Sequence, residues 1–175
     1  MQVGPATRHR QPLSMSGKLY LQFAKLAKIQ NFEQACLEFA RVFGLPTQRA
    51  EDGAKERISA WRDRVERMRD SIEGLKLARD EGALPSIGAA ITQIDVRLLP
   101  GEDGRATLAL HPNTLWDAMR LQLGQSIASD REIMTCPNCH DWFEVGGRGN
   151  GVKRAKAIFC GPKCKNEFNY RKRAA

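Results

Sequence analysis

The chain contains 175 residues, of which 42% are hydrophobic and 27% are charged, and its formal net charge is +8. This composition is typical of a soluble protein with one ordinary domain and room for a small accessory module. No apolar run approaches the roughly 18 residues that a membrane span needs, and no apolar stretch follows Arg8 and Arg10, so neither a membrane helix nor a secretory signal is expected.

The first part of the chain is predicted to be helical after an irregular start. Residues 1–16 combine Gly, Pro, Ser, Gln and Arg without periodicity, and we expect them to form a flexible arm. From residue 17 onward, apolar side chains recur at helical spacing as far as Gly44. Asn31 fits an N-cap between two short helices, and Gly44 is typical of a helix end.

A longer helix is predicted over about residues 54–79. Its apolar positions recur at alternating steps of three and four, as in a heptad seam: Ile58, Trp61, Val65, Met68, Ile72 and Leu75. Two interpretations are open. The seam pairs two copies of the chain in a coiled coil, or the helix lies with this face on its own domain. The shortness of the seam and the bulk of Trp61 favour the second.

The hydrophobic period then changes from helical to alternating. Ile94, Val96 and Leu98 alternate with charged residues, and the pattern resumes at Leu108 and Leu110 beyond a turn rich in Gly. A β-hairpin is therefore predicted over about residues 91–111. A further helix is expected from Thr114 to about Ala128, capped by Asn113, which completes an α+β domain over residues 17–130.

Four of the five cysteines are confined to a short segment near the C-terminus. Cys136 and Cys139 form a Cys-x2-Cys pair, and Cys160 and Cys164 form a Cys-x3-Cys pair. Thiolates are preferred ligands of tetrahedral zinc, so this spacing indicates one structural Zn²⁺ with closed coordination. Two disulfides or four free thiols are the alternatives. Without a signal sequence, the pattern favours the reducing cytoplasm.

Residues 136–175 are predicted to fold as a treble-clef-like zinc module. The first cysteine pair suits a tight turn, and the second pair lies at the start of a helix. Between them we expect a hairpin with strands at Trp142–Val145 and Ala157–Phe159, joined by the glycine-rich residues 146–151. Phe143, Phe159 and Phe168 are the candidate core residues of this module.

Six short motifs stand out in this module. They are Cys136-Pro137-Asn138-Cys139, Trp142-Phe143, Lys153-Arg154, Phe159-Cys160, Cys164-Lys165-Asn166-Glu167 and Arg171-Lys172-Arg173. Together they resemble the CGNR-type zinc fingers of bacteria. The similarity covers about residues 113–173. Lys165 and Glu167 stand where that family has Gly and Arg, so its name-giving motif is degenerate here. The resemblance implies a DNA-binding role and an N-terminal domain linked to stress-responsive transcription regulation.

The same segment is strongly basic. It holds nine of the 28 basic side chains but only three of the 20 acidic ones, for a net charge of +6. A small basic module is the expected footprint of a nucleic-acid partner, here taken to be DNA. The candidate contact residues are Arg148, Lys153, Arg154, Lys156, Lys163, Lys165, Asn166, Arg171, Lys172 and Arg173.

These features favour a nucleic-acid-binding protein, a bacterial transcription regulator whose N-terminal domain senses a ligand or dimerises. The alternative is a zinc-stabilised protein–protein interaction module whose basic residues only provide solubility. A nuclease-like enzyme is least favoured, because His9, His111 and His140 are widely spaced and no acid–base pair is apparent. Cys36, among apolar neighbours, is expected to be buried.

Overall fold

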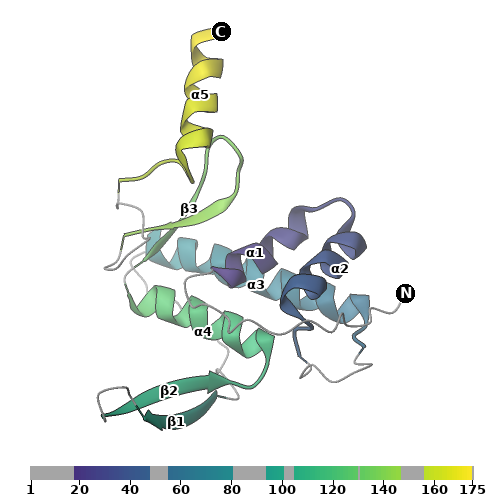
Figure 1. Cartoon of the computed structure of the whole chain (residues 1–175). Coiled ribbons are helices and arrows are strands. Elements are labelled where there is room, and N and C mark those ends of the chain that lie inside the picture. The colour runs from purple at the N-terminus through teal and green to yellow at the C-terminus, as the bar shows by residue number, and fades with distance from the viewer. Residues whose placement is uncertain are drawn as a thin grey trace.

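Figure 1 shows the computed structural model of the chain, which describes residues 18–47, 55–80, 94–100, 105–129, 131–146 and 156–174. Five α-helices and two separate two-stranded antiparallel sheets lie in these ranges, so the predicted α+β fold class is confirmed. The helices are α1 (Leu19–Lys25), continued by a 3-10 turn at Leu26–Lys28, α2 (Phe32–Phe43), α3 (Ile58–Asp80), α4 (Leu115–Ala128) and α5 (Pro162–Ala174). The strands are β1 (Ile94–Pro100), β2 (Ala106–Pro112), β3 (Glu132–Thr135) and β4 (Trp142–Val145). The predicted flexible arm, residues 1–16, lies outside the described residues.

The ends of α2 follow the sequence signals. The side chain of Asn31 accepts a hydrogen bond from the backbone N–H of Gln34 at 3.3 Å, which caps the helix as predicted. At the other end Gly44 has φ 93°, a conformation that glycine adopts without steric cost. The chain then turns toward α4, where the carbonyl of Pro46 accepts a hydrogen bond from the N–H of Trp116 at 2.8 Å.

The seam of α3 faces the interior of the same chain. Trp61, Val65, Met68 and Ile72 are each at most 1% exposed and pack with α1, α2 and α4 in one hydrophobic core. The ring centroid of Trp61 lies 5.8 Å from that of Phe23 and 6.0 Å from that of Phe39. The interpretation as a coiled coil over residues 54–79 is therefore wrong, because the side chains that it needs for a second copy are already buried.

The β1–β2 hairpin and α4 lie close to where the sequence places them. Strands β1 and β2 pair in antiparallel register, with Leu98 opposite Leu108. The cap of α4 is Thr114 rather than the predicted Asn113. The hydroxyl of Thr114 accepts from the N–H of Asp117 at 3.1 Å and donates to its carboxylate at 2.6 Å, so side chain and backbone are satisfied together.

The second sheet differs from the prediction. Strand β4 pairs with β3, which lies over residues 132–135 where no strand was predicted, and residues 156–159 do not form the expected returning strand. The first cysteine pair forms the tip of this hairpin. The loop is closed by hydrogen bonds from Cys136 N–H to the Asp141 carbonyl at 2.9 Å and from His140 N–H to the Cys136 carbonyl at 2.8 Å. These bonds let a cysteine turn close the hairpin without the glycine-rich segment.

We call β3 and β4 together the junction hairpin, because its two faces belong to different cores. Side chains alternate across a strand, and the register places Ile133 and Trp142 on one face and Met134 and Phe143 on the other. Ile133 and Trp142 join the core of the helices, whereas Phe143 and Met134 pack with the cysteines. One short hairpin thus fixes the cysteine cluster to helices α1 to α4, which we call the helical body (Figure 1).

Candidate metal centre

The four paired cysteines converge. The sulfur atoms of Cys136, Cys139, Cys160 and Cys164 all lie within 4.8 Å of one another. The Cys160 sulfur is 3.5 Å from that of Cys139 and 3.4 Å from that of Cys164. A disulfide needs about 2.05 Å, whereas tetrahedral Zn–S bonds of about 2.3 Å place sulfurs about 3.8 Å apart. The cluster can therefore hold one metal ion.

Two structural elements bring the sulfurs together. Cys136 directly follows β3, and Cys139 lies three residues further along the tip of the junction hairpin. Cys160 precedes α5 and Cys164 lies in its first turn, and their sulfur atoms are 3.4 Å apart. The turn that carries the first cysteine pair is also linked directly to α5, since Asn138 Nδ2 donates to Glu167 Oε2 at 2.8 Å.

The hydrogen bonds around Cys136 favour its thiolate form. Burial raises the pKa of Cys136, but hydrogen bonds from the backbone N–H groups of Cys160, Cys139 and Asn138 more than offset it and bring the pKa to about 6. Burial raises the pKa values of Cys139 and Cys160, and the sulfurs of Cys136 and Cys164 raise both further. Four sulfurs this close repel one another as thiolates, and a bound cation removes that repulsion.

A small apolar core surrounds the sulfurs. Phe143, Val145 and Cys136 are buried, and Met134, Ala157 and Phe159 pack against them. Phe168 on α5 is 36% exposed, with its ring centroid 5.3 Å from that of Phe159. The three predicted aromatic residues are therefore part of the module, although the contact that holds α5 is confined to its first half.

Lysines from the helical body hold the hairpin tip in place. Lys25 forms an ion pair with Asp141 at 3.0 Å, and Lys76 donates to the Thr135 hydroxyl at 3.0 Å. Lys28 donates to the carbonyl of His140 at 3.0 Å and also lies over the Trp142 ring, 4.0 Å from its centroid. The cluster contains no histidine within the described residues, and His140 is exposed with φ 58°, which fits a backbone role in the turn.

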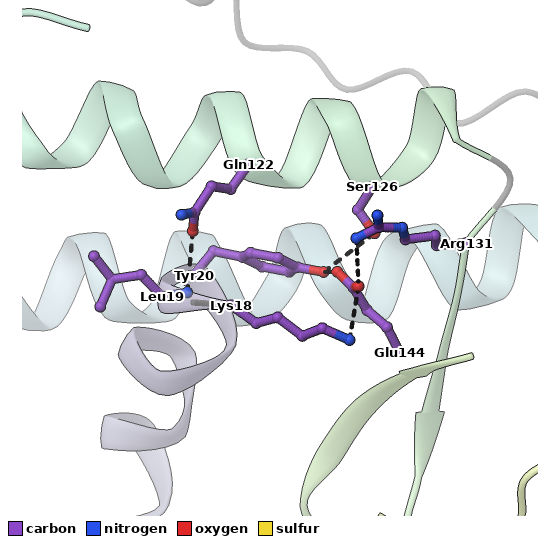
Figure 2. A network of polar contacts seen from close by, with 7 residues as sticks. All are labelled: Lys18, Leu19, Tyr20, Gln122, Ser126, Arg131 and Glu144. Atoms are coloured by element: carbon purple, nitrogen blue, oxygen red, sulfur yellow. Dashed lines mark hydrogen bonds and ion pairs between the residues drawn. The ribbon is translucent and has the colours of Figure 1, made fainter. Parts of the chain in front are cut away.

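Sequence reasoning missed a buried carboxylate on the body-facing side of the junction hairpin. Figure 2 shows Glu144, which is 1% exposed, among side chains from the start of α1, from α4 and from Arg131, which precedes β3. The Tyr20 hydroxyl donates to its carboxylate, and Lys18 and Arg131 pair with it at 2.9 and 3.0 Å. The signal in the sequence was one acidic residue inside the otherwise apolar strand 142–145.

The pKa values in this network reflect burial and mutual interaction. Burial acts to raise the pKa of Glu144, but hydrogen bonds from Tyr20, Lys18 and Ser126 and the charge of Lys18 lower it below its usual value. Burial and the nearby Glu144 charge raise the pKa of Tyr20. The carboxylate is therefore ionised and Tyr20 is neutral at neutral pH.

Of the predicted nucleic-acid contacts, seven lie within the described residues. These are Lys156, Lys163, Lys165, Asn166, Arg171, Lys172 and Arg173, and all are exposed. Arg148, Lys153 and Arg154 lie outside them. Six of the seven belong to α5, which stands away from the helical body in Figure 1 (yellow).

The remaining candidates do not join the cluster. His111 lies exposed on β2 opposite Asp95, and Cys36 is buried in the helical core, where burial raises its pKa to about 12. Among the helices in the described part of the chain, none combines the length and apolar character needed to cross a bilayer. No protein-family model matches the chain, and no curated protein matches it at a significant level.

Proposed function

We propose that the chain is a zinc-dependent DNA-binding protein, with the cysteine cluster holding one Zn²⁺ and α5 contacting the duplex. The observation that carries this proposal is the position of α5. The cluster fixes the start of this basic helix, and the rest of it projects from the body. The proposed metal ligands are Cys136, Cys139, Cys160 and Cys164, an all-thiolate set that zinc favours.

The helix has an inner and an outer face. Cys164 and Phe168 are four residues apart and face the cluster. Asn166, Tyr170 and Arg173 follow one another at steps of four and three, so they share the opposite face. Amide and guanidinium groups on an exposed helix are the side chains that read base edges in the major groove of B-DNA.

Charge supports a duplex partner. Arg171, Lys172 and Arg173 form a basic end on α5, and Lys163 and Lys165 are exposed near its start. Cations along a narrow projecting element neutralise phosphates and release counterions, which gives binding that weakens steeply with salt. The major groove of B-DNA admits a helix, whereas that of A-form RNA is too narrow. We therefore propose DNA rather than RNA.

The resemblance to CGNR-type fingers agrees with this role. It supports a bacterial transcription regulator that works in the cytoplasm, with the helical body sensing a signal. On this proposal neither part is catalytic. The zinc ion shapes the module, and α5 provides the contacts.

The test is a fluorescence anisotropy titration of the zinc-loaded full chain with a duplex at several salt concentrations. We expect the triple variant Arg171→Gln, Lys172→Gln and Arg173→Gln to bind more weakly and to lower the salt slope by about three, roughly one per lost phosphate contact. The charge-matched control replaces Arg41, Arg57 and Arg67, three exposed arginines of the helical body, by Gln. No binding at low salt, or equal losses in both triples, would contradict the proposal.

A further inference from the structure

The β1–β2 hairpin has one face made entirely of apolar side chains. In its register Val96 lies opposite Leu110, Leu98 opposite Leu108, and Pro100 opposite Ala106. Because alternate pairs point to the same side, these six residues share a face, which we call the apolar hairpin face. The charged Asp95 and Arg97 lie on the other side and pair with each other at 3.5 Å.

The large side chains of this face are exposed. Val96 is 59% exposed, Leu98 71%, Leu108 64% and Leu110 45%. Within the described residues, the hairpin contributes nothing to either hydrophobic core, and Figure 1 shows it beside α4, away from α1 and α2. Two strands without a packed face are at best marginally stable in water. Among the described residues, no layer packs on this face of the hairpin.

We propose that the apolar hairpin face packs against the same face of a second copy of the chain across a two-fold axis. A symmetric contact requires a patch that is compatible with itself. This face carries no charged side chain, so two copies meet without repulsion even though each chain has a net charge of +8. A partner that binds through charged groups has no charged side chain to contact on this face.

The exposed area fits such a contact. The four large side chains together expose on the order of 400 Å², which is the size of the largest apolar patch on a typical monomer, a patch that is often functional. Two faces remove roughly 800 Å², and the adjoining Pro100 and Ala106 bring the total toward the about 1,000 Å² expected of a specific interface. This inference does not depend on DNA binding, since it concerns a different surface.

The experiment is sedimentation velocity on the intact, zinc-loaded chain over a range of concentrations. We expect a monomer–dimer equilibrium in the wild type. Leu98→Glu forces two carboxylates together near the axis, and it should raise the dimer dissociation constant on the order of 100-fold. Leu99→Glu is the matched control. Leu99 is the next residue, is 48% exposed and points to the opposite face, so this variant should still dimerise.

Hydrogen exchange on the wild type provides a second measurement that needs no variant. The amides of residues 94–100 and 106–112 should exchange more slowly as the protein concentration rises through the dimer range, while those of α3 should not change. A wild type that stays monomeric at 100 µM, or equal dissociation constants for the Leu98 and Leu99 variants, overturns the proposal. Hairpin exchange that is independent of concentration also overturns it.

Discussion

Glu144 is ionised in a place with almost no access to water. The charge is tolerated because two cations and a hydroxyl replace the water that a carboxylate normally keeps. Lys18 and Tyr20 come from the start of α1, and Arg131 lies just before β3. Lys18 and Arg131 are about 30% exposed, but both point at the same buried oxygen. The network therefore ties the junction hairpin to α1 and α4.

Removing the charge of Glu144 should destabilise the folded protein. We expect Glu144→Gln to lower the free energy of unfolding by about 3 kcal/mol, because two cations then lose the counter-charge of the buried carboxylate. Urea denaturation at neutral pH measures this. Glu66→Gln, an exposed change on α3, is the control and should stay within about 0.5 kcal/mol of wild type. Equal effects would mean that the network contributes little.

The same residue predicts how stability depends on pH. The pKa of Glu144 is lower in the folded state than its ordinary value of 4.5, so the unfolded state takes up the proton first as the pH falls. Its stabilising contribution is complete above the unfolded pKa and is lost as the pH drops through the folded pKa. The stability difference between wild type and Glu144→Gln should therefore shrink below about pH 4.5. A difference that is constant from pH 6 to pH 3 would contradict this assignment.

At the scale of helices and strands, the sequence predicts those features that depend on residues close together in the chain. Asn31 and Gly44 delimit α2 because capping and a positive φ are local requirements. The cysteine spacing predicted convergence because a turn and a helix start place sulfurs within reach. It did not predict β3, whose four residues are too few to show a period, and the glycine-rich run offered a stronger turn signal.

The partners of Glu144 could not be predicted in the same way. Lys18 and Tyr20 are more than 120 residues away along the chain, and only the packing of α1 on β4 brings them together. The heptad pattern of α3 was ambiguous for a related reason. A seam has the same spacing whether it faces another chain or its own core, so only the observed burial decided between the two.

The metal should order one element and leave others intact. We expect a strong chelator to abolish hydrogen-exchange protection in α5, because the small core around Phe143 cannot hold the helix alone. Helix α3 should stay protected, since its buried seam packs in the separate helical core. Exchange measured with and without chelator tests this expectation, and an α5 that stays equally protected would refute a structural metal.

The cysteines allow a matched comparison by metal analysis. Cys164→Ser removes one proposed ligand and should reduce bound zinc from one per chain to well below one. Cys36→Ser changes a buried cysteine outside the cluster and should leave the zinc content at one per chain. Loss of metal from both variants would point to general unfolding rather than to loss of a ligand.

At the scale of the whole molecule, the helical body separates two exposed features of different character. In Figure 1 the β1–β2 hairpin and α5 project from opposite sides of the body. One presents apolar side chains and the other cationic ones. If each binds as proposed, dimer formation and DNA binding use surfaces that do not overlap. The Leu98→Glu variant should then keep the salt slope of the wild type, which the same anisotropy titration measures.

The junction hairpin makes the chain sensitive to insertions as well as to substitutions. Odd and even positions of β4 serve different cores, so one residue inserted between Trp142 and Phe143 exchanges the two sets and directs Glu144 at the cysteines. An insertion there should prevent folding, whereas one in residues 101–104, which connect β1 and β2, should be tolerated. Natural variants of this protein should therefore differ in length between β1 and β2, while the spacing from Glu132 to Val145 stays fixed.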